Sequence, residues 1–224
     1  MADTKLAKKS IRVLAGLRPV FCLNNVMTKF ILGKKLGMST IYDEKQGALN
    51  VTLVECEPNV ITQIRTDEKD GYSATQIGLR KSQIPNPKSQ AKEKKAFLKI
   101  KEFRGEMKDL KAGDELKIDQ FEIGDKVKVS GISKAKGFQG VVKRHGFKGA
   151  PKSHGHKHDL RAPGSIGATF PEHVIKGKRM AGRMGGERKS SLNLKIVEID
   201  KENNILFLKG AVPGVKGRIV EIVG

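Results

Sequence analysis

The chain lacks the features that define several classes of protein. It has only two cysteines, Cys22 and Cys56, no tryptophan, and just 5% aromatic residues among its 224 positions. Two thiols make neither a disulfide framework nor, on their own, a zinc site. The apolar runs are short: residues 51–54 are interrupted by Thr52, and residues 205–208 form a run of only four, far shorter than the ~20 residues of a membrane helix. A disulfide scaffold and a helical membrane protein are therefore excluded, and a reducing, cytosolic setting is favoured.

Motifs of nucleotide-binding and hydrolytic enzymes are also lacking. The stretch from Gly140 to Gly146 is one residue too long for a P-loop and is followed by Phe147. No G-x-G-x-x-G follows a predicted strand. Glu172 precedes His173, but no serine or cysteine in a nucleophile context accompanies them. We therefore expect no enzyme activity, no cofactor and no small-molecule substrate.

Positive charge, in contrast, is abundant and concentrated in one segment. The 44 Lys and Arg exceed the 24 Asp and Glu by 20, and residues 131–190 alone hold 14 basic and 3 acidic residues, a net charge of +11. The same segment has twelve glycines, all five histidines and no sustained apolar period. Such a segment cannot bury enough apolar surface to fold by itself. We expect residues 133–189 to form an arm that orders only against a partner.

The flanking regions show the alternation of β-strands. Val127 and Val129 alternate with Lys126 and Lys128, as in a strand with one buried face. Similar runs predict strands at residues 51–56, 60–65, 74–79, 194–199, 205–209 and 218–223. Short strands on both sides of the arm predict a mainly β protein, with a small closed barrel that its two ends complete.

Two segments depart from this pattern. Residues 85–111 are rich in lysine, with one or two helical turns expected at residues 91–96 and a thin apolar stripe at Phe97, Ile100 and Phe103. Residues 1–26 are basic, and their apolar centre is broken by Arg18 and Pro19, which disfavours a secretory signal. An organellar leader is one reading of residues 1–26. An upstream extension before a working start at Met27 is favoured, and we expect it to be poorly packed.

The arm favours RNA as the polyanion. Lys and Arg neutralise phosphates, and charge carried by a Gly-rich arm rather than a helix face disfavours reading of the DNA major groove. An extended chain suits the crevices of a folded RNA. A solvated basic loop is the alternative. His154, His156 and His158 alternate and, if extended, would present three imidazoles to one side. A metal site there is disfavoured by nearby lysines, so contacts to RNA are expected and no metal is predicted.

Five blocks of sequence resemble one family. They are Lys34–Met38, Gly131–Arg144, Arg161–Gly167, Lys176–Gly185 and Lys209–Gly214. Together they resemble the universal third protein of the large ribosomal subunit, in its bacterial or organellar form, from Met27 to the C-terminus. The resemblance implies a Greek-key β-barrel of the translation-protein type with an inserted α/β segment. It also implies a long, basic, Gly-rich central extension that runs through ribosomal RNA (rRNA) toward the peptidyl-transferase centre.

The resemblance also implies a layout along the chain. Residues 27–132 would form the first part of the barrel, with strands at 27–82 and 112–132 and a variable insert at 83–111. Residues 133–189 would form the extension, and residues 190–224 would complete the barrel. Many bacterial members carry a methylated Gln after the Ser-Ile-Gly block, whereas Ala168-Thr169-Phe170 stands here. That modification is therefore not expected.

The implied function is structural. The chain would bind large-subunit rRNA, aid subunit assembly and support the surroundings of the peptidyl-transferase centre, beside neighbouring ribosomal proteins and without a membrane. A cytoplasmic ribosome is favoured over an organellar one. A free RNA-binding or assembly-chaperone barrel that leaves mature subunits is the open alternative.

Two sets of residues are predicted to carry this function. The rRNA contacts are Lys34, Lys35, Lys134, Lys136, Lys143, Arg144, His145, Lys148, Lys152, His154, His156, Arg161, Lys178, Arg179, Arg183 and Arg188. The tip of the extension near the peptidyl-transferase centre would be Gly164, Ser165, Ile166, Gly167, Ala168, Thr169, Phe170 and Pro171.

Overall fold

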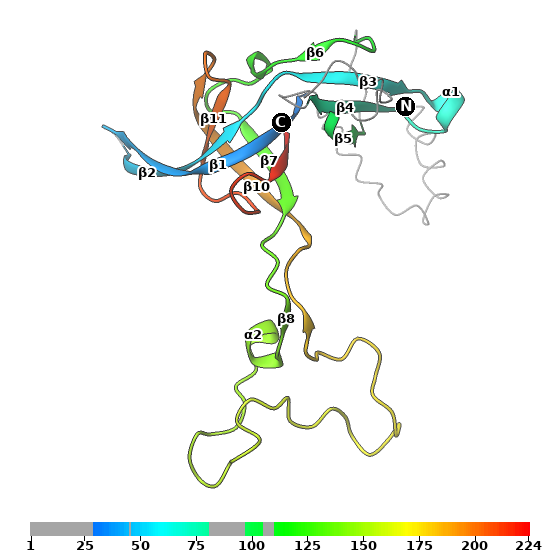
Figure 1. Ribbon diagram of the computed structural model, residues 1–224, viewed down its shortest axis with the longest axis vertical. Coiled ribbons are helices and arrows are strands. Elements are labelled where there is room, and N and C mark those ends of the chain that lie inside the picture. The colour runs from blue at the N-terminus through cyan, green and yellow to red at the C-terminus, as the bar shows by residue number, and fades with distance from the viewer. Residues whose placement is uncertain (1–28, 45, 81–96, 105–109) are drawn as a thin grey trace, which may run out of the picture.

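A computed structural model describes residues 29–44, 46–80, 97–104 and 110–224 (Figure 1). The predicted N-terminal extension, the expected helical turns at residues 91–96 and much of the variable insert lie outside these residues. The described part consists mainly of strands with a few short helices, so the prediction of a mainly β protein is confirmed. Among the described residues, no helix has the length and apolar character needed to cross a bilayer.

Six antiparallel strands close on themselves. They pair in the order β1 (Phe30–Asp43), β12 (Ile219–Val223), β7 (Lys126–Ile132), β10 (Arg188–Asp200), β11 (Ile205–Lys209) and β2 (Gly47–Glu55). Closure results from β2, which pairs with β1 on one side and β11 on the other. Each barrel strand therefore has two hydrogen-bonded neighbours, while residues 36–43 of β1 extend past β12 and pair only with β2, and residues 47–50 of β2 extend past β11 and pair only with β1.

The alternation of apolar and polar residues explains which face of each strand points into the barrel. Val127 and Val129 are buried, whereas Lys126 is exposed and Lys128 is half-buried on the opposite face. Together with side chains such as Leu206 from the other strands, these valines form a core inside the barrel. Alternation thus places one apolar face of each strand toward the interior.

A second sheet covers the outside of the barrel. It has the order β5 (Phe97–Phe103), β4 (Ala74–Arg80), β3 (Asn59–Arg65) and β6 (Glu115–Leu116). A separate core joins it to β1, where the Phe30 and Phe103 rings stack with centroids 4.9 Å apart. Residues 59–80 had been expected within the barrel. They belong to this second sheet instead, because their apolar faces pack on the outer side of β1.

The stripe expected at Phe97, Ile100 and Phe103 is also corrected. Residues 97–103 form a strand whose less exposed positions alternate, with Phe103 buried and Ile100 exposed. Pairing with β4 imposes a period of two, so the three-residue spacing does not define one face. The remaining short helices are α1 (Asp67–Asp70), η2 (Ile118–Gln120) and α2 (Val141–His145).

Candidate nucleic-acid interface

The arm leaves and returns through neighbouring barrel strands. Ile132, the last residue of β7, is the register partner of Arg188, the first residue of β10. Figure 1 shows the connecting chain projecting far from the barrel and its covering sheet. The arm is therefore a long insertion into one antiparallel strand pair.

The first part of the arm is a two-chain stalk, formed by residues 133–139 and 182–187. The Ser133 amide donates to the Glu187 carbonyl at 2.9 Å, and the Lys136 amide donates to the Met184 carbonyl at 2.9 Å. Two short strands follow, β8 (Phe138–Gln139) and β9 (Gly182–Arg183), which pair antiparallel. Backbone hydrogen bonds, rather than a core, thus define the stalk.

A clasp closes the stalk at its far end. Arg144, on α2, donates from Nη1 to the Met180 carbonyl at 2.6 Å, and His145 Nε2 lies 3.1 Å from the same oxygen. A Cβ at Gly182 would lie 2.7 Å from Arg144 Nη1, so a larger residue there would displace the guanidinium from this position. Arg144 and His145 are half-buried. Both predicted RNA contacts therefore also hold the arm together.

Beyond the clasp, residues 146–181 form a distal loop without regular helix or strand. The predicted tip lies in this loop, with residues 164–170 exposed and Pro171 half-buried. Phe170 is 85% exposed and Ile166 is 42% exposed. In Figure 1 the yellow-green and yellow parts of this loop spread apart at the far end of the arm. The loop therefore presents backbone and apolar side chains to its surroundings.

Most of the predicted basic contacts are exposed on the arm. These residues are Lys134, Lys136, Lys143, Lys148, Lys152, His154, His156, Arg161, Lys178, Arg179, Arg183 and Arg188. With charges on the stalk, clasp and distal loop alike, the arm presents positive charge along its whole length. Such a surface suits a polyanion that follows an extended path.

The two lysines predicted on β1 differ from each other. Lys34 is exposed, with its Nζ 3.6 Å from a carboxylate oxygen of Glu55. Lys35 is only 9% exposed, and its Nζ donates to the carbonyls of Val212 at 2.7 Å and Gly214 at 3.3 Å. Burial, together with the charge of Lys134, lowers the pKa of Lys35. The predicted RNA contact of Lys35 is corrected by this geometry, because its ammonium holds the 210–217 loop instead.

The three alternating histidines do not form a one-sided row. The chain turns at His154 (φ 64°) and Gly155 (φ 80°), so the segment is not extended. His154, His156 and His158 are all exposed. Within the described residues, no group of three His, Cys, Asp or Glu side chains is arranged to hold a metal ion. The arrangement leaves these imidazoles available to an external partner.

Comparison with known proteins identifies the family. The family Ribosomal protein L3 matches residues 109–205, which include the whole arm. "Large ribosomal subunit protein uL3" of Bacillus cytotoxicus is 44% identical over 205 residues, covering 88% of this chain and 97% of the relative. The protein of the same name from Streptococcus pyogenes serotype M1 is 46% identical over 201 residues, covering 88% and 96%. The chain belongs to the ribosomal protein L3 family. The resemblance seen in the motifs is confirmed.

One feature of this L3-family chain was not indicated by its motifs. Glu221 on β12 is 8% exposed, accepts a hydrogen bond from Arg188 on β10, and lies 3.3 Å from Lys101 Nζ on β5. Burial alone would raise the pKa of Glu221, but the bond from Arg188 and the charge of Lys101 outweigh burial and lower it. These ion pairs join the barrel, the covering sheet and the root of the arm. The residues are far apart in sequence, so no local pattern could have revealed them.

Proposed function

We propose that the chain is a structural constituent of the large ribosomal subunit and that its arm binds rRNA. The observation that carries this proposal is the arm itself, found in an L3-family chain. Residues 131–190 have a net charge of +11, and Val141 is the only hydrophobic residue buried within residues 133–189. Such a projection needs an external polyanion to offset its charge and to order its backbone.

The same proposal includes the position of each part of the chain in the large subunit. The closed barrel is of the Greek-key translation type and lies at the outer face of the subunit, beside neighbouring ribosomal proteins. The arm runs through rRNA, and residues 164–171 approach the peptidyl-transferase centre, where they support translation without a catalytic group or a cofactor. The arm orders on RNA, so it also aids assembly. The ribosome concerned is cytoplasmic.

Sedimentation tests the proposal directly. Tagged full-length chain should travel with large subunits through a sucrose gradient at high salt, because many buried phosphate contacts are retained together. A chain found only in the soluble fraction would contradict the proposal. Mass spectrometry of mature subunits distinguishes a constituent, present in each particle, from an assembly factor found only on precursors.

A further inference from the structure

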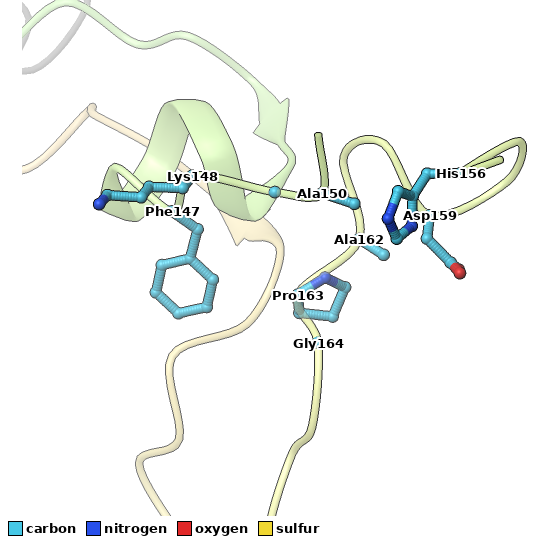
Figure 2. A pocket seen from close by; sticks show the side chains of 9 residues that line it. Phe147, Lys148, Ala150, His156, Asp159, Ala162, Pro163 and Gly164 are labelled. Atoms are coloured by element: carbon cyan, nitrogen blue, oxygen red, sulfur yellow. The ribbon is translucent and has the colours of Figure 1, made fainter. Parts of the chain in front are cut away.

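The distal loop contains an open hollow that RNA phosphate binding does not explain. Its volume is about 780 Å³, and its lining includes Phe147, Ala150, His156, Asp159 and Pro163. Figure 2 shows the Phe147 ring and Pro163 on opposite sides of a gap, with His156 and Asp159 beyond Pro163. The Lys148 side chain points away from the other lining residues. The walls are therefore largely apolar and aromatic, although the arm around them is basic.

Local backbone contacts hold these walls in place. Gly149 has a φ of 72°, and a Cβ there would collide with the carbonyl oxygen of Leu160. The Ala162 amide donates to the Asp159 carbonyl at 3.1 Å, which closes a turn beside the hollow. The close approach at Gly149 brings residues 147–150 against residues 159–164. The hollow is thus formed by two chain segments that contact each other directly.

The lining matches the chemistry of an unpaired nucleobase. Single-stranded bases in folded RNA stack on aromatic side chains and offer their hydrogen-bonding edges to polar groups. Phe147 and Pro163 offer apolar surfaces on which a flat ring can pack, and His156 adds a second ring. A phosphate, in contrast, would gain nothing from these apolar walls. The hollow therefore suits a base rather than the RNA backbone.

Asp159 favours a base that carries an amino group. It is one of 3 acidic residues among residues 131–190, and its exposed carboxylate has no hydrogen-bond or ion-pair partner within the described part of the chain. An ionised carboxylate accepts hydrogen bonds but donates none, and it repels phosphate. It does, however, pair with the amino group of a base. Guanine, adenine and cytosine carry such a group, whereas uracil lacks it and offers only a single ring N3–H.

We propose that the hollow binds one unpaired, amino-bearing rRNA base, which stacks on Phe147 and donates a hydrogen bond to Asp159. This inference rests on the proposed function, since it assigns a specific RNA contact to the arm. It predicts that a single guanine, adenine or cytosine is shielded inside large subunits by this loop.

Chemical probing of assembled large subunits tests the inference. Subunits would be prepared with wild-type chain, Phe147→Leu or Asp159→Asn, then treated with kethoxal for guanine, dimethyl sulfate for adenine and cytosine, and carbodiimide for uracil. Phe147→Leu removes the stacking ring but keeps apolar volume, and its target base should gain reactivity by about five-fold or more. Asp159→Asn keeps the shape but replaces one acceptor oxygen with an amide donor, and should expose the same nucleotide.

Phe138→Leu is the matched control, because Phe138 is an exposed phenylalanine of the stalk that does not line the hollow. It should leave that nucleotide protected. If no nucleotide responds, if only uridines respond, or if the control produces the same change, the base site is overturned. If Phe147→Leu subunits do not assemble, Asp159→Asn decides. Absence of the wild-type chain from large subunits would overturn the proposed function itself, which separates the two failures.

Discussion

The barrel and the arm use their hydrophobic residues in opposite ways. Side chains such as Ile31, Val54 and Leu206 are completely buried in the barrel, whereas Phe138 and Phe170 on the arm are 78% and 85% exposed. The barrel is held by apolar burial and closed strand pairing. The arm is held by backbone hydrogen bonds in its stalk and by the Arg144 clasp.

This difference shows that one chain can contain two parts with separate partners. One core fills the barrel, and a second core joins the barrel to its covering sheet. The arm exposes charge and rings that only an external partner can satisfy. Substitutions should therefore separate folding from RNA binding.

The largest effect on stability is expected inside the barrel. Leu206→Ala removes a fully buried side chain and should lower the free energy of unfolding by about 2–5 kcal/mol. Phe170→Ala, at an exposed arm position, should change it by less than about 0.5 kcal/mol. Denaturant unfolding of the free protein measures both. Equal losses would show that the arm is part of the folding unit.

Removing positive charge from the arm should affect RNA binding rather than stability. Alanine at Lys134, Lys136 and Lys143 should weaken rRNA binding and flatten the slope of log affinity against log salt by about 2–3 units, because fewer counterions are released. The free energy of unfolding should stay nearly constant. Arg144 is kept, since it also forms the clasp.

A control variant carries three alanines at exposed lysines outside the arm. These are Lys117, Lys126 and Lys195. The control loses the same charge, yet its salt slope should change much less. An equal slope change would mean that net charge, rather than the arm, sets RNA affinity.

A substitution that distorts the backbone of the stalk should have a smaller effect on rRNA affinity. Gly185 has a φ of 73°, and a Cβ there would collide with the Lys134 carbonyl oxygen. Gly185→Ala should cost the bound arm about 1–2 kcal/mol from the left-handed backbone alone, so rRNA affinity should fall about ten-fold. Because no cation is lost, the salt slope should be unchanged. Gly140→Ala, with open space around its Cβ position, should bind normally in the same titration.

Loss of the ion pairs at Glu221 should have the smallest effect, a change in the free energy of unfolding that depends on pH. The pKa of this carboxyl is lowered in the folded protein, so its stabilisation is present above its ordinary value of 4.5 and is lost as pH falls through the folded-state pKa. Glu221→Gln should cost about 1 kcal/mol at neutral pH. That difference should shrink well below pH 4.5. Urea unfolding at both pH values measures this, with the exposed Glu198→Gln as control; a constant difference would contradict it.

The strands themselves could be predicted from sequence because alternation records burial directly. The predicted strand at residues 205–209 coincides with β11, and the alternation of Val127 and Val129 with their lysine neighbours falls within β7. Alternation could not show which surface covers a buried face. Residues 59–80 were therefore placed in the barrel, although they cover its outside. At β5, the lysines Lys99 and Lys101 occupy the less exposed face, so the apolar pattern was misleading.

The arm could be predicted because charge and glycine are properties of composition. The roles of single residues within it could not, since they depend on distances across the fold. Lys35 looks like any other basic residue in the sequence, yet its ammonium reaches carbonyls more than 170 positions away. Asp159 and Phe147 meet at one hollow only because the chain turns back at Gly149.

The pairing of Ile132 with Arg188 has a consequence for the length of the arm. For the barrel, everything between these two residues is a hairpin connection, and the entropy of closing a flexible connection rises only with the logarithm of its length. Each doubling costs about 0.6 kcal/mol. Insertions or deletions in the distal loop therefore change neither the register of β7 and β10 nor the closure of the barrel. The reach of the arm can vary independently of the fold that anchors it.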